Sequence, residues 1–215
     1  MGQKVNPNVI RIGSFTGWNS RWFDEKRYKE TLLQDFILRK LLMDRLKIAG
    51  VARVEIERSI NSLKVIAHVS RPGIVIGRAG TGLEELKKFL NLHLQKSGLA
   101  KNMPKLDIRI EPVKEPNLDA YLVAKNVSEQ LTKRLPFKRI LGQTAERVMS
   151  SGAKGVRIAL AGRINGAEIG RREKIQLGTV PLSTLRELIV YASVPSLTKK
   201  GYIGVKVWIH KAESK

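Results

Sequence analysis

The spacing of apolar residues in the first half of the chain restricts the fold more than any other feature of the sequence. A helical pattern runs from about Tyr28 to Ala49, and Gly50 follows it, where a glycine commonly ends a helix. Two stretches then alternate apolar and polar residues, at 53–57 and at 63–69, with a turn between them at 59–62. We therefore expect one long helix followed by a β-hairpin.

The pattern continues with a glycine-containing turn between two helices. Pro72–Ile76 is a short apolar turn, and Gly77–Gly80 follows it directly. Thr81–Glu84 has the Thr-x-x-Glu form of a capping box, which predicts the start of a helix. That helix carries apolar residues on one face, and an alternating pattern returns at 105–111. The predicted order is helix, strand, strand, short helix, helix, strand.

Three Gly-x-x-Gly motifs occur, at 77–80, 152–155 and 201–204, where composition alone would produce about 1.5 of them. Their contexts differ. The glycines at 152 and 155 lie between a predicted helix and a predicted strand, so we interpret both as capping residues. Those at 201 and 204 lead into a strand. Only the first motif joins an apolar turn to a capped amphipathic helix.

The residue types of this first motif suit a sugar–phosphate backbone. Two glycines without a Cβ allow that backbone to approach the main chain, and free N–H groups at a helix N-terminus favour phosphate. Arg78 adds a positive charge, and residues 74–76 offer an apolar floor for unstacked bases. The arrangement resembles a type II KH domain, whose Gly-x-x-Gly loop clamps about four nucleotides. We predict that Gly77, Arg78, Ala79 and Gly80 bind RNA. The alternative is a simple helix–turn–helix made tight by its glycines.

The proline-punctuated segment 112–116 marks a predicted linker between a KH domain at 28–111 and a second domain at 117–215. The second domain shows two helical patterns and then four strand-like runs. The predicted fold is therefore α+β throughout, with a type II KH domain followed by two helices and a mostly antiparallel four-stranded sheet. Residues 1–27 have no sustained period. We expect an extended arm there, docked through its aromatic residues, with a frayed terminus as the alternative.

The net charge indicates a polyanionic partner. Lys and Arg number 40 against 19 Asp and Glu, which gives a formal charge of +21 in a chain that is 42% hydrophobic and so able to form cores. Nucleic acid is the first choice for such a chain and a membrane surface the second. No apolar run approaches the roughly 18 residues that span a bilayer. The N-terminal residues lack the apolar stretch of a signal peptide and there is no cysteine, so we expect a cytoplasmic protein without a membrane partner.

Basic residues gather in the second domain. Between 133 and 174 there are eleven of them against three glutamates, a local balance of +8. Such clustering is typical of phosphate contacts, which hold RNA without reading its sequence, although a solvated charged surface is the alternative. We assign to RNA binding here Lys133, Arg134, Lys138, Arg139, Lys154, Arg163, Arg171, Arg172 and Lys174, with Arg163 at the tip of a predicted hairpin. Lys4 and Arg21 join this set from the arm.

The sequence offers little for catalysis or for a metal. His68, His93 and His210 lie far apart, without the spacing of metal ligands. There is no Walker A sequence, no Gly-x-Ser-x-Gly elbow and no cysteine nucleophile. We therefore predict no enzyme, no cofactor, no metal and no small-molecule substrate. A nuclease is the least favoured hypothesis, because no acid–base set can be nominated for it.

Six segments in order make the chain resemble the bacterial S-three family of small-subunit ribosomal proteins over essentially its whole length. The segments are Met1–Pro7, Asn19–Phe23, Arg71–Gly77, Gly162–Ile169, Val180–Arg186 and Gly204–Ile209. Six matches in the right order are far more specific than one glycine loop. Many members of the family carry a longer C-terminal tail than this chain, so no contact of such a tail is carried over.

The resemblance implies a protein of the head of the small ribosomal subunit. It implies small-subunit ribosomal RNA and neighbouring head proteins as partners, and a place near the channel through which messenger RNA enters. In the family, basic residues on and just after the first long helix of the second domain face that channel, which here match Lys133, Arg134, Lys138 and Arg139. The alternative is a free KH protein that regulates messenger or small RNA. The aromatic arm favours the ribosomal interpretation.

Overall fold

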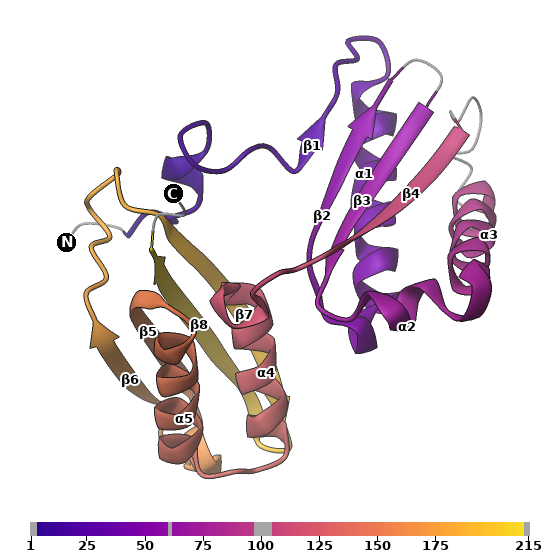
Figure 1. Cartoon of the computed structure of the whole chain (residues 1–215). Coiled ribbons are helices and arrows are strands. Elements are labelled where there is room, and N and C mark those ends of the chain that lie inside the picture. Colours follow the sequence, from indigo (N-terminus) through magenta and orange to yellow (C-terminus); the bar gives the residue numbers. More distant parts are fainter. Residues whose placement is uncertain (1–3, 60–61, 97–104, 213–215) are drawn as a thin grey trace. The chain divides into compact units, whose positions relative to one another are not determined.

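The computed structural model describes residues 4–59, 62–96 and 105–212 (Figure 1). Its internal contacts separate two compact units. The first unit is Trp18–Lys114, and the second unit is Met1–Gly17 together with Glu115–Lys215. In the described part of the chain, no helix combines the length and the apolar composition that a membrane span requires.

The first unit has the element order predicted from the sequence. Its elements are β1 (Ser20–Arg21), α1 (Tyr28–Arg45), η2 (Lys47–Ala49), β2 (Val51–Arg58), β3 (Ser62–Val69), α2 (Pro72–Ile76), η3 (Arg78–Gly80), α3 (Thr81–Lys96) and β4 (Lys105–Pro112). The strands lie in the order β1-β2-β3-β4, with β2 and β3 antiparallel and β3 and β4 parallel. Because parallel neighbours need a long crossover, α2 and α3 serve as that connection. The type II KH topology is thus confirmed, although the predicted turn at 59–62 falls partly outside the described residues.

The core of the first unit lies between the sheet and one side of α1 and α3. Leu38 and Leu42 of α1, like Leu90 and Leu94 of α3, have no exposed surface and pack with inward-facing strand residues. A second apolar row on α1, Leu33, Ile37 and Leu41, is less buried, since Leu33 is 44% exposed and the other two are only partly buried. Periodicity identified the helix, but it did not decide which of two apolar rows faces the sheet.

The part of the arm that lies in the first unit is held by a buried carboxylate. Asp35 accepts hydrogen bonds from Trp22 Nε1 at 2.8 Å, from Ser20 Oγ at 3.3 Å and from Arg58 Nε at 2.7 Å. β1 also pairs in parallel with the edge of β2. The expected docking through aromatic residues holds only for Trp22, because Trp18 and Phe23 are 66% and 85% exposed.

The second unit is one sheet covered on one face by two helices (Figure 1). Its elements are η1 (Val9–Arg11), η4 (Pro116–Leu118), α4 (Ala120–Thr132), α5 (Phe137–Ser150), β5 (Ala153–Gly162), η5 (Ile164–Gly166), β6 (Arg171–Gly178), β7 (Ile189–Thr198) and β8 (Gly201–Lys211). The strand order is β6-β5-β8-β7, and all three pairings are antiparallel. The predicted two helices and four-stranded sheet are confirmed. Apolar residues of α4 and α5 bury one face of the sheet, which leaves the alternate residues of each strand on the opposite face.

Arg11 ties the N-terminal segment into the second unit. It is only 1% exposed, and burial lowers its pKa from the ordinary value, although a guanidinium stays charged at neutral pH. Its nitrogens donate hydrogen bonds of 2.8 to 3.2 Å to the carbonyl oxygens of Pro7, Leu182, Thr184 and Glu187. One arginine therefore satisfies backbone groups of a segment before β7 that has no regular structure of its own. No motif in the sequence marks Arg11 for this role.

Two local interpretations from the sequence are wrong. Thr81 is not a helix cap, because it is the first residue of α3 and its Oγ1 donates to the Arg78 carbonyl at 3.0 Å. Gly155 is not a cap either, because it lies inside β5, where a Cβ would come within 2.2 Å of the Thr179 carbonyl oxygen. It allows a close backbone approach instead. Gly152, with φ +94°, does follow the end of α5 as predicted.

Candidate RNA-binding surfaces

The loop at 77–80 has the backbone that its glycines predict. α2 ends at Ile76, Gly77 has φ +68° and ψ −172°, and Gly80 has φ +82°. Both glycines thus adopt conformations that other residues rarely take. A third glycine, which the sequence analysis missed, brings the two helices together. A Cβ at Gly82 would lie 2.4 Å from the Val75 carbonyl oxygen, so only glycine lets α3 begin this close to α2.

The loop presents main chain and one cation to solvent. Gly77 and Arg78 are exposed directly before the N-terminus of α3, the end of a helix that favours an anion, although its first amide, Thr81 N–H, already bonds to the Arg78 carbonyl. Ile74 and Ile76 are exposed beside them, whereas Val75 is buried in the core. The predicted apolar floor therefore consists of two side chains rather than three. This geometry suits a single strand whose phosphates meet the loop and whose bases meet the isoleucines.

The predicted basic residues around the α4–α5 turn do lie together. Lys133, Arg134, Lys138 and Arg139 are all exposed at the end of α4 and the beginning of α5. Arg134 has φ +60°, and its N–H bonds to the Leu131 carbonyl at 2.9 Å, in the position that glycine usually occupies after a helix. The turn therefore directs a charged side chain outward where a neutral glycine would be easier to accommodate.

Other residues of the predicted cluster lie elsewhere in the second unit. Arg172 and Lys174 alternate with Ile175 and Leu177, which pack against the core, so the two cations belong to the sheet face that the helices leave uncovered. Arg171 is exposed at the start of the same edge strand. The basic residues that lie close together in the sequence are therefore divided between the uncovered face of the sheet and the side that carries α4 and α5.

Lys154 lies at the opposite end of β5 from Arg163 and has a carboxylate partner. Its Nζ is 3.6 Å from Oε2 of Glu187, which also accepts a hydrogen bond from His210 Nε2 at 2.6 Å. The bond from His210 is the main reason that the pKa of Glu187 is lowered from its ordinary value, and the charge of Lys154 adds to it. This pairing makes Lys154 a weaker candidate for phosphate.

Arg21 and Lys4, the two predicted RNA-binding residues of the arm, also differ in whether a carboxylate pairs with them. Arg21 Nη1 lies 3.3 Å from Glu57 Oε1, and Nη2 lies 3.9 Å from Glu55 Oε2. Lys4 is exposed, and no ion pair involving it occurs among the residues that the structure describes. Of the two, Lys4 has its charge free for an external phosphate.

A cleft in the second unit collects cations that the sequence analysis had partly missed. It is lined by Arg134 and Arg163, which were predicted, and by Lys199 and Lys200, which were not. Lys199 and Lys200 form the two-residue connection between β7 and β8. A Thr-Lys-Lys-Gly sequence between two alternating runs was the available signal, because a two-residue loop places both side chains at a hairpin tip.

No group of three His, Cys, Asp or Glu residues that could hold a metal is present among the described residues. Two of the histidines have carboxylate neighbours instead. His68 Nε2 is 3.1 Å from Glu55 Oε1, and His210 Nδ1 is 2.9 Å from the Thr179 carbonyl oxygen in addition to its bond to Glu187. These contacts suit packing roles for both rings.

Comparison with known proteins agrees with both units. The KH domain family matches residues 37–118, and the family described as ribosomal protein S3, C-terminal domain, matches residues 127–209. The chain is 46% identical to small ribosomal subunit protein uS3 of Desulfitobacterium hafniense and 44% identical to that of Lactobacillus acidophilus. Each alignment covers 99% of this chain, with 94% and 92% of the respective relative. The chain belongs to the uS3 family.

The uS3 protein of Hydrogenovibrio crunogenus is similar to the same extent, at 45% identity over 99% of this chain and 90% of the relative. The relatives carry the names of ribosomal proteins and not of enzymes, in agreement with the prediction that the chain is not an enzyme. Both candidate surfaces lie inside uS3 family domains. The glycine loop falls in the KH match, and the α4–α5 turn and the β7–β8 connection fall in the C-terminal match.

Proposed function

We propose that this uS3-family chain is a structural constituent of the head of the small ribosomal subunit in the cytoplasm. There it binds small-subunit ribosomal RNA, contacts neighbouring head proteins and touches messenger RNA near the channel through which it enters. The observation that carries the proposal is the loop Gly77–Gly80, with two positive-φ glycines opening α3 inside a matched KH domain. The formal charge of +21 supplies the attraction to a polyanion.

The messenger contact is assigned to the α4–α5 turn. Lys133, Arg134, Lys138 and Arg139 are exposed there, and none of them takes part in an ion pair among the residues with a described structure. Free cations close together at a turn suit a strand of phosphates that must slide past, because phosphate contacts hold RNA without reading its bases. Ribosomal RNA and messenger RNA offer the same phosphate chemistry, so experiment must separate them.

Sedimentation tests the ribosomal assignment. A tagged full-length chain, expressed in a bacterial host, should migrate with small subunits when a cell extract is separated on a sucrose gradient. A control variant with Lys26→Ala and Lys29→Ala, which removes two exposed charges outside the candidate surfaces, should migrate in the same way as the unchanged chain. A chain found mainly outside ribosomal particles would instead favour the free KH regulator.

Crosslinking tests the messenger contact. Small subunits that contain the chain are programmed with messenger RNA carrying 4-thiouridine at successive positions downstream of the decoded codon. We expect crosslinks to peptides of the α4–α5 turn, and fewer of them when Lys133 and Arg134 are changed to alanine. Crosslinks from ribosomal RNA alone, with none from the messenger, would reject this part of the proposal while leaving the ribosomal assignment intact.

A further inference from the structure

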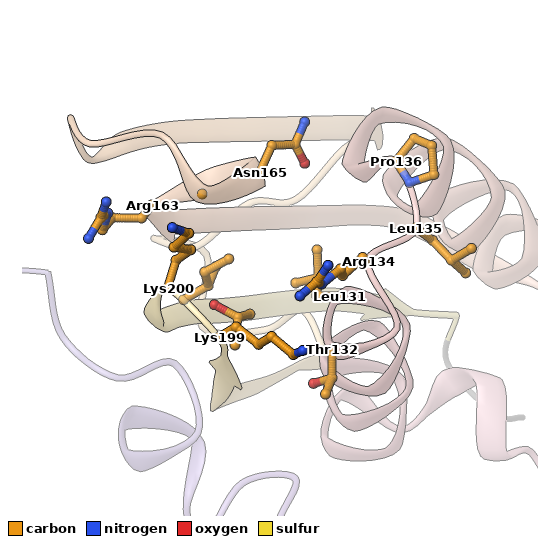
Figure 2. A pocket seen from close by; sticks show the side chains of 12 residues that line it. Leu131, Thr132, Arg134, Leu135, Pro136, Arg163, Asn165, Lys199 and Lys200 are labelled. Carbon is orange, nitrogen blue, oxygen red and sulfur yellow. The ribbon is translucent and has the colours of Figure 1, made fainter.

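Three segments that are distant in the sequence form one cleft of about 440 Å³ in the second unit (Figure 2). They are the α4–α5 turn, the connection between β5 and β6 that contains η5, and the two-residue connection between β7 and β8. The described residues on all sides of the cleft belong to the same unit, so its shape depends on one packed body. A pocket of several hundred cubic ångströms is large enough for one small ligand.

The rim of the cleft is cationic. Arg134, Arg163, Lys199 and Lys200 line it, and no lining residue is acidic. None of these four appears in an ion pair within the described ranges. Figure 2 shows Arg134 and Lys199 extending into the space between the α4–α5 turn and the β7–β8 connection, with the Arg163 side chain at the other end of the cleft and directed away from them. Unpaired positive charges around one concave site, with no acidic residue among its lining, favour an anion, because a concave wall concentrates the field.

The floor of the cleft is apolar. Leu131 and Ile203 are buried beneath it, while Leu135 and Pro136 are exposed at one side. A site for a bare inorganic anion would need only the cations. An apolar floor beside a cationic rim suits a ligand with both an anionic and a flat apolar part, as a nucleotide has.

Local backbone geometry and contacts fix the positions of three of these cations. Arg134 holds the positive φ described above, a conformation that non-glycine residues seldom adopt without a compensating role. Arg163 Nε donates to the Ala167 carbonyl at 2.8 Å, which fixes its direction. The stem of Lys200 lies over Gly166, where an added Cβ would come within 3.1 Å of Lys200 Cγ. Gly166 therefore leaves room for the lysine beside the cleft.

We infer that the cleft binds one nucleotide of single-stranded RNA. The phosphate lies among Arg134, Lys199 and Lys200, and the ribose and base lie against Leu135 and Pro136. An unpaired strand is required, because paired bases face each other and cannot reach a floor that also lies next to the phosphate. The inference rests on the proposed RNA-binding function, and it adds Lys199 and Lys200 together with a preference for single strands.

Lysine footprinting on the full chain tests the inference. Acetylation of Lys199 and Lys200 is followed by mass spectrometry, first without ligand and then with hexauridylate, with a blunt RNA duplex or with inorganic phosphate. We expect hexauridylate to slow acetylation of both lysines severalfold, and the duplex and phosphate at equal phosphate concentration to slow it little. Equal protection by phosphate would show an unselective anion site and overturn the inference.

Variants give the second measurement. Lys199→Ala with Lys200→Ala should weaken hexauridylate binding and lower the slope of log K against log salt by about 0.7 for each phosphate that the variant no longer neutralises. Leu135→Ser should weaken hexauridylate binding and leave that slope unchanged, because it removes apolar surface only. The charge-matched control is Lys26→Ala with Lys29→Ala, which should change neither value. Circular dichroism confirms that each variant is folded.

The outcomes distinguish this inference from the proposed function. If the chain binds hexauridylate while Lys199 and Lys200 stay unprotected and their replacement has no effect, the cleft is not a nucleotide site, and the proposed function stands. If the chain binds none of the RNA probes at low salt, both proposals fail. If only the duplex protects the lysines, the preference for single strands is wrong.

Discussion

The glycine loop and the cationic cleft, the two proposed RNA-binding sites, differ in the groups that they offer to phosphate. In our proposal the loop meets phosphate with main-chain amides, and its one arginine, Arg78, lies between glycines with φ of +68° and +82°. In our inference the cleft meets phosphate with the long cationic side chains of Arg134, Lys199 and Lys200 beside an apolar floor. The loop therefore depends on what its residues lack, since a Cβ would disturb the backbone. The cleft depends instead on the positive charge of its side chains.

This contrast shows why one site was visible in the sequence and the other was not. The two glycines and the arginine of the loop lie within four consecutive residues directly before α3. The cleft draws on residues 131–136, 163–166 and 198–203, which only the sheet brings together. A contiguous site leaves a motif, whereas a site assembled from distant segments leaves only scattered charges.

The loop and the cleft lie in different units, so one unit should be able to lose stability without the other. Arg11→Ala, in the unit that contains the cleft, should show this with the largest effect. Loss of the guanidinium leaves four carbonyl groups without their donor, so we expect the second unit to lose about 3 kcal/mol of unfolding free energy. Hydrogen exchange with mass spectrometry should show reduced protection at residues 179–189 and unchanged protection in α3. Arg11→Lys should be nearly as damaging, because an ammonium cannot reach four carbonyls. An equal reduction of protection in both units would contradict the separation.

The next effect concerns the loop. Arg78→Asp with Ala79→Asp replaces one positive charge by two negative charges at the N-terminus of α3, so RNA affinity at low salt should fall more than about tenfold. The fold should survive, because Arg78 is exposed. Fluorescence anisotropy with a labelled single strand measures the affinity. The charge-matched control, Lys26→Asp with Lys29→Ala, also lowers the net charge by three and reports the effect of net charge alone. An equal loss of affinity there would remove the loop from the site.

Glycine exchange should act in opposite directions in the two regions. Gly77→Ala forces an alanine to φ +68° and brings its Cβ within 3.2 Å of Gly82 N, so the first unit should lose about 1 to 2 kcal/mol. Arg134→Gly relieves a positive φ, so the unfolding free energy should stay the same or rise by up to about 1 kcal/mol while RNA affinity falls. Urea unfolding and anisotropy measure the two quantities. A destabilised Arg134→Gly chain would show that the arginine is there for packing.

The smallest effect concerns the far end of the second unit, where Lys154 is paired. The pKa of Glu187 is lowered in the folded state, mainly by the bond from His210, so its stabilising contribution is present above its ordinary value of 4.5 and is lost as the pH falls below it. Glu187→Gln should lower the melting temperature slightly at pH 7, and the difference from the unchanged chain should shrink as the pH is lowered below about 4. A difference that stays constant over this range would mean that the charge of Glu187 plays no part.

Local patterns carried much of the fold. Alternation and helical spacing identified the strands and helices of both units, because each element buries one face and so repeats its apolar residues at its own period. They did not show that Leu33 is exposed while Leu38 is buried, nor that Gly155 serves a close approach rather than a cap. Those outcomes depend on which neighbour an element meets. The role of Arg11 could not be predicted for the same reason, because the carbonyl groups that it binds come from residues distant in the sequence.

The sequence alone determined the class of partner, the order of elements and the glycine loop, because charge, periodicity and a missing Cβ act locally along the chain. Only the tertiary structure decided how the basic residues are divided. Arg172 and Lys174 belong to the uncovered face of the sheet, Lys154 pairs with Glu187, and Arg134 meets Lys199 and Lys200 around one cleft. The physical reason is that side chains alternate across a strand and that strands distant in the sequence pair side by side. Residues close in the sequence therefore lie on opposite faces, and residues distant in the sequence come into contact.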